Sequence, residues 1–468
     1  MRGQKDPNGR AGRTGPRVTP DFDAMISIVS WNSAGFFFTE FMIPYAGVTL
    51  GGSGLSIGLM FSFLVLGSAI SSVLVGFLTD KTRKTTLILI GSIGRGTSYI
   101  VMYAGILLGS IPTMSVGTFI LGLLVGFFWV PFDALVSNKS NKDDRSYAFG
   151  KRHAAVGRGQ IIGGLIGVTI FILSSEFTPG NDALLFSPML LYFASNVIGG
   201  WLFTRRVDEH VFYRASDTTE TWDSSRVLTN GSRHHGERAG ESSDDATTLK
   251  NPPDNGSTPA QSKRGLLLGF TLLLVSYFLS SVNGMMAKPF LQIYLLRLVT
   301  DSPTLVLIAY APAGVLTMLA SPKLGKLADR MNPYMGIALF SALGATATIA
   351  ILLTRNIFLF SAILIADMVF ANASSLVLSN IFSRVSIKHR GKVIGAGSAA
   401  NNLGGSLGPI LGGGLVDTIG ITSPFVASIF IELSLIGPYL LALKRLKPYL
   451  AEQLSAPGIT TDEKESAR

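Results

Sequence analysis

Four ionisable residues lie inside long apolar segments of this 468-residue chain, where a charge is difficult to accommodate. They are Glu40, Asp133, Lys288 and Asp367. A charged side chain at the centre of a membrane-spanning helix costs roughly 2.5–3.5 kcal/mol, so it normally faces protein or water and has a partner. A carboxylate so placed can take up and release a proton as its surroundings change. Asp367 is the first candidate for such a proton carrier and Glu40 the second, with a permanent structural ion pair as the alternative.

Three further charges, Arg95, Arg158 and Glu432, also lie in apolar segments. For Arg158 and Glu432 we expect structural contacts, or side chains that reach toward the lipid headgroups. Helical spacing also places Gly122, Gly126 and Trp129 on one face with Asp133, and we expect that face to line an aqueous cavity.

The segments that carry these charges have the length of membrane-spanning helices. The chain is 47% apolar and only 15% charged. Its apolar residues fall into twelve blocks of about 20, and about 20 residues at 1.5 Å rise cross the ~30 Å hydrocarbon core of a bilayer. This pattern excludes a soluble enzyme, a secreted disulfide scaffold and a coiled coil. We expect spans near 25–48, 55–78, 86–109, 114–136, 153–174, 184–204, 265–290, 303–322, 334–354, 357–380, 393–416 and 423–443.

Lys and Arg are distributed unevenly between these spans. One side of the membrane receives 34 of the 39 basic residues, and the other receives only Arg297 and Arg355. Because basic loops stay on the cytoplasmic side, we expect a multi-pass protein of the cell membrane with both termini in the cytoplasm. The formal net charge of +10 does not indicate a nucleic-acid partner, because most basic residues adjoin apolar blocks.

One polar segment near the middle of the chain differs from all others. Residues 206–263 are rich in Ser, Thr, Asn, Asp and Gly, and they cannot bury enough apolar surface to fold. We therefore predict a disordered cytoplasmic linker. The predicted organisation is a cytoplasmic N-terminal tail (1–23), an N-terminal six-helix bundle (24–205), the linker (206–263), a C-terminal six-helix bundle (264–446) and a cytoplasmic C-terminal tail (447–468).

The two halves of the chain share an internal repeat. The second span is followed by Gly76-Phe-Leu-Thr-Asp80-Lys81-Thr-Arg83-Lys84, and the eighth by Gly325-Lys-Leu-Ala-Asp329-Arg330. A second pair of similar segments, 145–167 and 390–412, is separated by nearly the same offset. Two matches at nearly one offset indicate a duplication. Repeats of this kind recur in secondary transporters, with the substrate site between the halves.

With its twelve spans and this repeated motif, the chain resembles the major facilitator superfamily over residues 24–446. The loop that begins at Gly76 looks like that family's signature loop, and the segment from Gly325 to Arg330 looks like its weaker copy. The resemblance implies two pseudo-symmetric bundles that rock about a central cavity lined by spans 1, 4, 7 and 10. These spans hold the four charges. The chain departs from the proton-coupled drug antiporters of the superfamily, because its fourth span lacks the Arg that they usually carry.

Each residue type in the signature loop has a physical role to play. Gly76 would let neighbouring helices approach closely. Asp80 would accept a hydrogen bond from the N-terminus of a neighbouring helix or form an ion pair with a basic side chain. Lys81, Arg83 and Lys84 would lie at anionic headgroups, unless they serve only to fix the topology. We expect this loop and its copy to act as a cytoplasmic gate.

Glu40 and Lys288 are expected to meet. Alignment of the two halves places Glu40 opposite Met286, so Lys288 lies two residues, or about 3 Å, further along its span. We therefore predict an ion pair that forms when the outer mouth closes. The competing hypothesis is that either residue binds a charged substrate directly.

The expected function is secondary active transport of a small solute by alternating access, coupled to a proton or sodium gradient. A passive facilitator or channel and a non-transporting membrane sensor are the alternatives. We expect no enzymatic activity, no cofactor and no metal, because no cluster of His, Asp or Glu occurs at metal spacing and no nucleotide-binding loop is present. The expected partners are a small-molecule substrate, H⁺ or Na⁺ and the lipid bilayer, and we expect the protein to function as a monomer.

Overall fold

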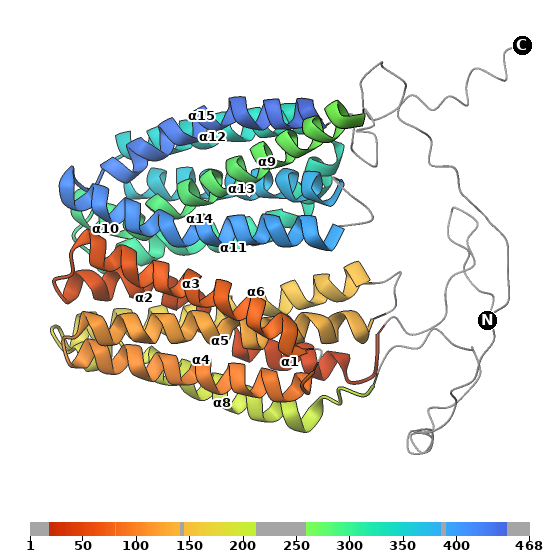
Figure 1. Cartoon of the computed structure of the whole chain (residues 1–468). Coiled ribbons are helices and arrows are strands. Elements are labelled where there is room, and N and C mark those ends of the chain that lie inside the picture. Colours follow the sequence, from red (N-terminus) through yellow and green to blue (C-terminus); the bar gives the residue numbers. More distant parts are fainter. Residues whose placement is uncertain (1–17, 80, 141–144, 212–258, 385–389, 447–468) are drawn as a thin grey trace, which may run out of the picture.

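The computed structural model describes residues 18–79, 81–140, 145–211, 259–384 and 390–446, and these residues are almost wholly helical. Figure 1 shows two bundles of roughly aligned helices lying side by side. The first bundle contains α1 to α8 and the second contains α9 to α15. The predicted all-α membrane fold, with twelve spans in two bundles, is confirmed.

The helices of the N-terminal bundle are α1 (Phe22–Asn32), α2 (Phe36–Thr49), α3 (Gly54–Thr79), α4 (Lys84–Leu107), α5 (Ile111–Asn138), α6 (Arg145–Phe177), α7 (Asp182–Leu185) and α8 (Pro188–Arg206). Those of the C-terminal bundle are α9 (Pro259–Ala287), the short 3₁₀ helix η3 (Lys288–Phe290), α10 (Leu291–Leu298), α11 (Pro303–Arg330), α12 (Pro333–Leu353), α13 (Ile357–Arg384), α14 (Arg390–Thr418) and α15 (Ser423–Leu446). We call the end at which α1 begins and α15 ends the terminal end, and the opposite end the distal end (Figure 1).

Several helices begin at a polar cap followed by proline. Ser110, Ser302 and Asn332 each accept a hydrogen bond from a backbone N–H of the first turn, and a proline follows within two residues. The cap satisfies a donor that has no partner within the helix, and proline fits the first turn because its missing N–H is not needed there. Short connections with these signals set where the spans begin.

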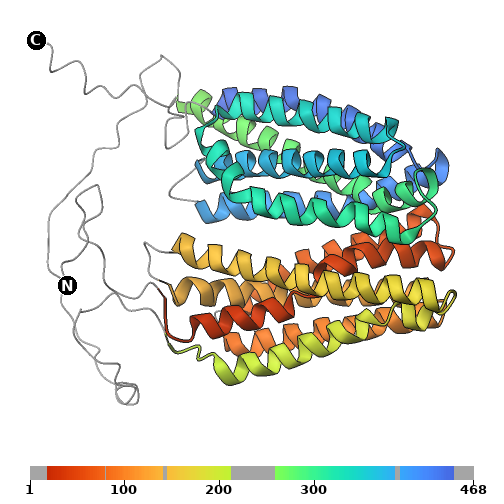
Figure 2. The same ribbon diagram turned by 180° about the vertical axis from the view of Figure 1, so that it is seen from behind.

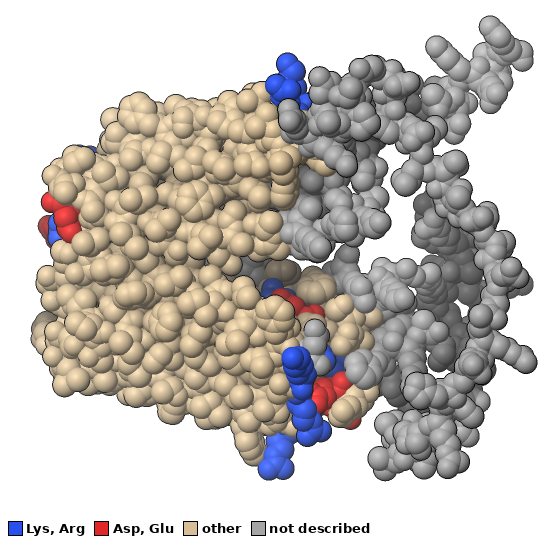
Figure 3. All heavy atoms as spheres, viewed as in Figure 1, with Lys and Arg blue, Asp and Glu red and all other residues tan. Residues whose placement is uncertain are grey.

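In the part of the chain described, nine helices are long and apolar enough to cross a membrane. The other three spans are interrupted or less apolar. The first is divided into α1 and α2, α11 contributes only a shorter apolar stretch, and α14 is rich in glycine. On the face drawn in Figure 3, the side of the molecule is almost free of charged side chains, which gather at its two ends. Such a surface fits a hydrocarbon environment.

The first span is broken, although the sequence predicted a continuous helix over 25–48. Residues 33–35 separate α1 from α2, and the freed carbonyl of Asn32 accepts a hydrogen bond of 2.6 Å from Arg95 Nη2. The Arg95 side chain is fully buried, with its guanidinium over the rings of Phe36 at 4.7 Å and Phe128 at 4.9 Å. Arg95 thus supports the break, because an unsatisfied carbonyl inside a membrane protein is costly.

The seventh span is also interrupted. The sequence predicted a helix over 265–290, whereas α9 ends at Ala287 and η3 leads into α10, which ends at Leu298. Pro289 lies in η3, and proline removes a backbone donor from the helix interior. Both interrupted spans carry one of the charges singled out above, Glu40 and Lys288.

Candidate functional site

The two bundles meet through the backbones of α3 and α14 near the distal end. A Cβ added to Gly58 would overlap the carbonyl of Pro409, and one added to Gly413 would lie 2.7 Å from the carbonyl carbon of Gly54. Glycine at these positions therefore allows a helix-to-helix approach that any side chain would prevent. This contact joins the two bundles near that end.

A carboxylate from one bundle caps a helix of the other at the same place. Asp417, near the end of α14, accepts hydrogen bonds from the backbone N–H groups of Gly54 at 2.7 Å and Leu55 at 2.8 Å. These are donors of the first turn of α3, where the helix dipole also favours a negative charge. The sequence analysis did not identify Asp417. Its distance of more than 350 residues from Gly54 along the chain left no local signal for the contact.

The predicted ion pair between Glu40 and Lys288 is present. Lys288 Nζ lies 3.4 Å from Glu40 Oε1, and the pair joins α2 of one broken span to η3 of the other. The Lys288 and Glu40 side chains are 36% and 48% exposed, so this is a partly solvated pair. Together with the Asp417 cap, this ion pair is a charged contact between the two bundles. The distance alone does not test its predicted role as a gate.

Asp133 does not reach across to the other bundle. It pairs with Arg152 of α6, whose Nε lies 3.0 Å from Asp133 Oδ1. The Arg152 guanidinium also lies 4.4 Å from the centre of the Trp129 ring. Gly122 and Gly126, which were predicted to share a cavity-lining face with Trp129 and Asp133, instead have a packing role. A Cβ at Gly122 would overlap Leu64 of α3, and one at Gly126 would overlap Ser71 of α3. The expectation that this whole face lines a cavity is therefore wrong.

Asp367 lies within the C-terminal bundle, near Glu432. Its carboxylate is close enough to act electrostatically on Glu432, which accepts a hydrogen bond of 3.2 Å from Asn283 Nδ2. A Cβ at Gly344 of α12 would lie 3.1 Å from Glu432 Oε1, so this carboxylate is directed into the bundle. Glu432 therefore does not reach toward the headgroups, and it is a functional candidate that the sequence analysis undervalued.

Asn283 completes this group. Its side chain is 6% exposed, and its Oδ1 has no hydrogen-bond partner among the described residues. Within the described part of the bundle, no basic side chain forms an ion pair with Asp367 or Glu432. We call Asn283, Asp367 and Glu432 the acidic cluster. Of the four charges predicted to share one cavity, the structure thus brings only Glu40 and Lys288 together.

The signature loop is described in part. Arg83 Nε lies 3.0 Å from Glu209 Oε1, and the other Glu209 oxygen accepts from the backbone N–H of Thr85 at 3.1 Å. Glu209 therefore caps α4, whereas Lys81 is exposed. Burial would raise the pKa of Glu209, but these hydrogen bonds and Arg83 hold it below its usual value. No contact to Lys84 enters this arrangement.

Close helix packing at Gly76 is not observed in this structure. Gly76 is exposed, and an added Cβ would meet no described atom within 4 Å. The residue lies on the outward face of α3 rather than at a helix contact. Asp80, the surroundings of Gly325 and the side chains of Asp329 and Arg330 are not described, and most of the predicted linker 206–263 also lies outside the described residues. Their roles remain predictions.

Lys139 is the basic residue whose role the sequence analysis missed. Its side chain is fully buried, and Nζ lies 2.6 Å from Asp21 Oδ2 and donates to the carbonyls of Asp208 and Val211. The sequence analysis counted Lys139 only as a marker of topology. It instead ties the start of α1 to the segment that follows α8.

The family and the fold can now be compared with known proteins. The family model described as Major Facilitator Superfamily matches residues 25–385 and 273–465. No curated protein matches the chain. Two solved structures of a bacterial homologue of the human lysosomal transporter Spinster, both inward-facing, are 14% identical. The unoccupied form has a TM-score of 0.66 over 92% of this chain and 98% of that one, and the occupied form 0.67 over 90% and 96%.

A structure concerned with substrate recognition in proton-dependent oligopeptide transporters is also similar. It is 15% identical, with a TM-score of 0.61 over 92% of this chain and 98% of that one. At such low identity these likenesses show the fold alone. The family match extends over most of the chain and agrees with the two packed bundles and the repeated motif. The protein is therefore a multi-pass membrane protein that belongs to the Major Facilitator Superfamily, a family of transporters.

Proposed function

We propose that this protein is a secondary active transporter that moves a small solute by alternating access and is coupled to a proton or sodium gradient. The observation that carries the proposal is the contact between the bundles near the distal end. It consists of a glycine-to-backbone contact between α3 and α14, the Asp417 cap and the Glu40–Lys288 pair. All three can break together as the bundles rock, because each has its two partners on different bundles.

The distribution of basic residues supports an orientation for this arrangement. If the terminal end is cytoplasmic, as the excess of Lys and Arg there favours, the closed distal end faces outward. The structure then represents an inward-facing state, which is also the state named for the Spinster homologue. On this proposal the protein lies in the cell membrane with both termini in the cytoplasm and works as a monomer.

The acidic cluster supports the coupling part of the proposal. Two carboxylates and an amide oxygen that has no hydrogen-bond partner among the described residues could hold a proton or a sodium ion, and neither carboxylate is neutralised by a described base. Both ions compensate a buried negative charge, which is otherwise costly. Binding or release of the ion would then change the free energy of each state of the transporter.

Transport by the purified protein in proteoliposomes tests the proposal. Labelled di- and tripeptides, amino acids, sugars and organic anions would be offered under an imposed pH or sodium gradient. We expect accumulation of at least one class above its equilibrium level, and collapse of that accumulation when the gradient is dissipated. Equilibration without accumulation would indicate a passive facilitator. The absence of flux for every class would favour a sensor.

The orientation can be tested separately, because the chain has no native cysteine to remove. Single cysteines at Thr113, near the distal end of α5, and at Ser243 provide the two probes. On intact cells an impermeant thiol reagent should label the cysteine at Thr113 and not that at Ser243. The reverse pattern would invert the assignment of every gate.

A further inference from the structure

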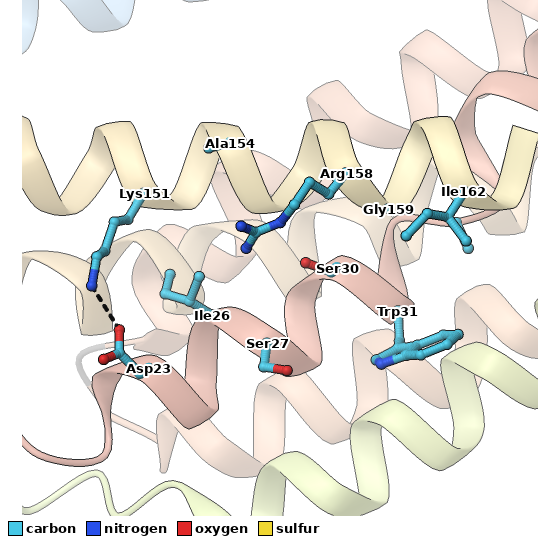
Figure 4. Close-up of a pocket in the computed structure, with 11 residues that line it drawn as sticks. Asp23, Ile26, Ser27, Ser30, Trp31, Lys151, Ala154, Arg158, Gly159 and Ile162 are labelled. Atoms are coloured by element: carbon cyan, nitrogen blue, oxygen red, sulfur yellow. Dashed lines mark hydrogen bonds and ion pairs between the residues drawn. The ribbon is translucent and has the colours of Figure 1, made fainter.

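A groove between α1 and α6 lies apart from the contacts between the bundles. Its volume is about 470 Å³, and Figure 4 shows how its side chains are arranged along the two helices. Asp23 and Lys151 lie at one end and Trp31 and Ile162 at the other, with Arg158 between them. The groove is thus polar toward the terminal end and apolar further along the helices.

The groove opens toward the surrounding membrane. In Figure 2, α1 lies at the outer surface of the N-terminal bundle, between α6 and α8. On α6 the residues that follow Arg158 at helical spacing are exposed and apolar, with Ile162 48%, Leu165 62% and Leu173 50% accessible. Trp31 is 59% accessible. Exposed apolar side chains on a membrane-spanning bundle contact acyl chains, so the wall of the groove continues into the lipid-facing surface.

Arg158 is the unpaired cation of this groove. Lys151 Nζ lies 2.8 Å from Asp23 Oδ1, so those two charges neutralise one another. No described residue forms an ion pair or hydrogen bond with Arg158, although a charge within a membrane span requires a partner. Arg158 is exposed in the groove and is therefore accessible to an anion from outside the described residues.

The depth of Arg158 identifies the source of that anion. A span of about 20 residues that ends at Phe177, the distal end of α6, begins near residue 158. Arg158 therefore lies at the boundary of the hydrocarbon layer, at the level of the lipid phosphates of the leaflet at the terminal end. Tryptophan is enriched at this boundary, and Trp31 lies beside the groove.

We propose that this groove binds an anionic phospholipid, whose headgroup phosphate pairs with Arg158 and whose acyl chains lie along Ile162 and Leu165. The planar guanidinium can donate two parallel hydrogen bonds to a phosphate. The hydroxyls of Ser27 and Ser30, which line the same groove, supply further donors for the headgroup. The proposal holds whatever solute the protein transports.

Lipid binding to the purified, delipidated full-length protein in detergent tests the proposal. Native mass spectrometry and thermal stabilisation would be measured with phosphatidylglycerol, with phosphatidylcholine and with inorganic phosphate. We expect selective binding of phosphatidylglycerol, weakened about tenfold or more by Arg158→Gln and less by Arg158→Lys, which keeps the charge but not the paired donors. Arg205→Gln is the matched control, because Arg205 lies at the terminal end over Trp201 and outside the groove.

A second variant predicts a gain that structural damage could not produce. Asp23→Asn removes a negative charge and leaves Lys151 without its ion-pair partner, so it should strengthen phosphatidylglycerol binding severalfold. Equal stabilisation by inorganic phosphate would overturn the lipid assignment in favour of a soluble anion. Equal binding by the wild type and Arg158→Gln, or no gain with Asp23→Asn, would overturn the role given to the groove's charges.

Discussion

The two bundles treat their charged residues differently. In the N-terminal bundle acids meet bases: Lys139 Nζ lies 2.6 Å from Asp21 and Arg152 Nε 3.0 Å from Asp133. In the described part of the C-terminal bundle, Glu432 accepts a hydrogen bond from the amide of Asn283, and neither Glu432 nor Asp367 forms an ion pair with a basic side chain. Two halves that share a repeated sequence motif thus differ in how they compensate these carboxylates.

This difference suggests that the carboxylates of the two bundles have different roles. A carboxylate paired with a base keeps its charge and holds two helices together. A carboxylate in an apolar bundle without a base has a free energy that depends on whether a proton or cation is bound. We therefore expect the N-terminal bundle to serve as a rigid frame and the acidic cluster to respond to the coupling ion.

The largest effect should follow from Asp367→Asn. Removal of the carboxylate should reduce gradient-driven accumulation to near background, because the coupling ion loses its site. Exchange of labelled for unlabelled solute, which needs no net ion movement, should persist. Both rates would be measured in proteoliposomes. Asp133→Asn is the matched control and should retain accumulation. If Asp133→Asn abolishes accumulation and Asp367→Asn retains it, the roles assigned to the two bundles are wrong.

The next largest effect should be on stability and should come from Asp21→Asn. Lys139 is fully buried, and loss of one partner of a buried ion pair typically costs about 3–5 kcal/mol. The melting temperature of the purified protein should fall by several degrees, while transport remains coupled at temperatures where the variant is folded. Addition of Lys139→Met should recover part of the loss. An unchanged melting temperature would show that Lys139 depends mainly on the carbonyls of Asp208 and Val211.

A smaller effect is expected at the ion pair that joins the bundles. Glu40 and Lys288 are each more than one-third exposed, so the pair should contribute about 1 kcal/mol or less. Glu40→Gln or Lys288→Ala should raise labelling of a cysteine at Val48 severalfold, because Val48 faces Gln292 and Leu296 of the other bundle. The exchange of Glu40→Lys with Lys288→Glu should restore the original labelling in part. If neither single variant changes labelling, the pair is no gate.

The smallest effect concerns Glu209 and is visible only through pH. Burial opposes ionisation, but the hydrogen bonds from Thr85 and the Arg83 pair lower the pKa of Glu209 in the folded protein. A lowered folded pKa means that the contribution to stability is present above the unfolded value of about 4.3 and is lost as pH falls through the folded value. Glu209→Gln should therefore lower the melting temperature slightly at pH 7 and leave it unchanged at the acidic end. A difference that persists below pH 3 would assign the effect to another cause.

The repeat explains why one contact could be predicted and another could not. Glu40 and Lys288 stand at nearly equivalent positions of two duplicated halves, and a twofold arrangement brings such positions together. Asp133 has no such constraint. Arg152 is 19 residues away on α6, and only the packing of α5 against α6 decides that they meet.

The break in the first span shows the same limit. Its sequence is apolar and continuous enough to predict one helix, whereas Arg95 and Tyr99 of α4 and Tyr192 of α8 surround residues 32–35. A Cβ at Gly35 would lie 2.7 Å from Tyr99 Oη, so the small residue there is required by helices that are distant in sequence.

The amino-acid sequence alone was enough to predict the twelve spans, their orientation and the charges that need a partner. It could do so because a bilayer imposes a fixed apolar length and penalises every charge within it. The packing of the helices was needed to show which charges are paired, that Asp417 caps α3, that Glu432 and Asn283 lie near Asp367, and that Arg158 lines a groove between α1 and α6. These contacts depend on distances of a few ångströms between helices far apart in the chain. Local sequence patterns do not specify such distances.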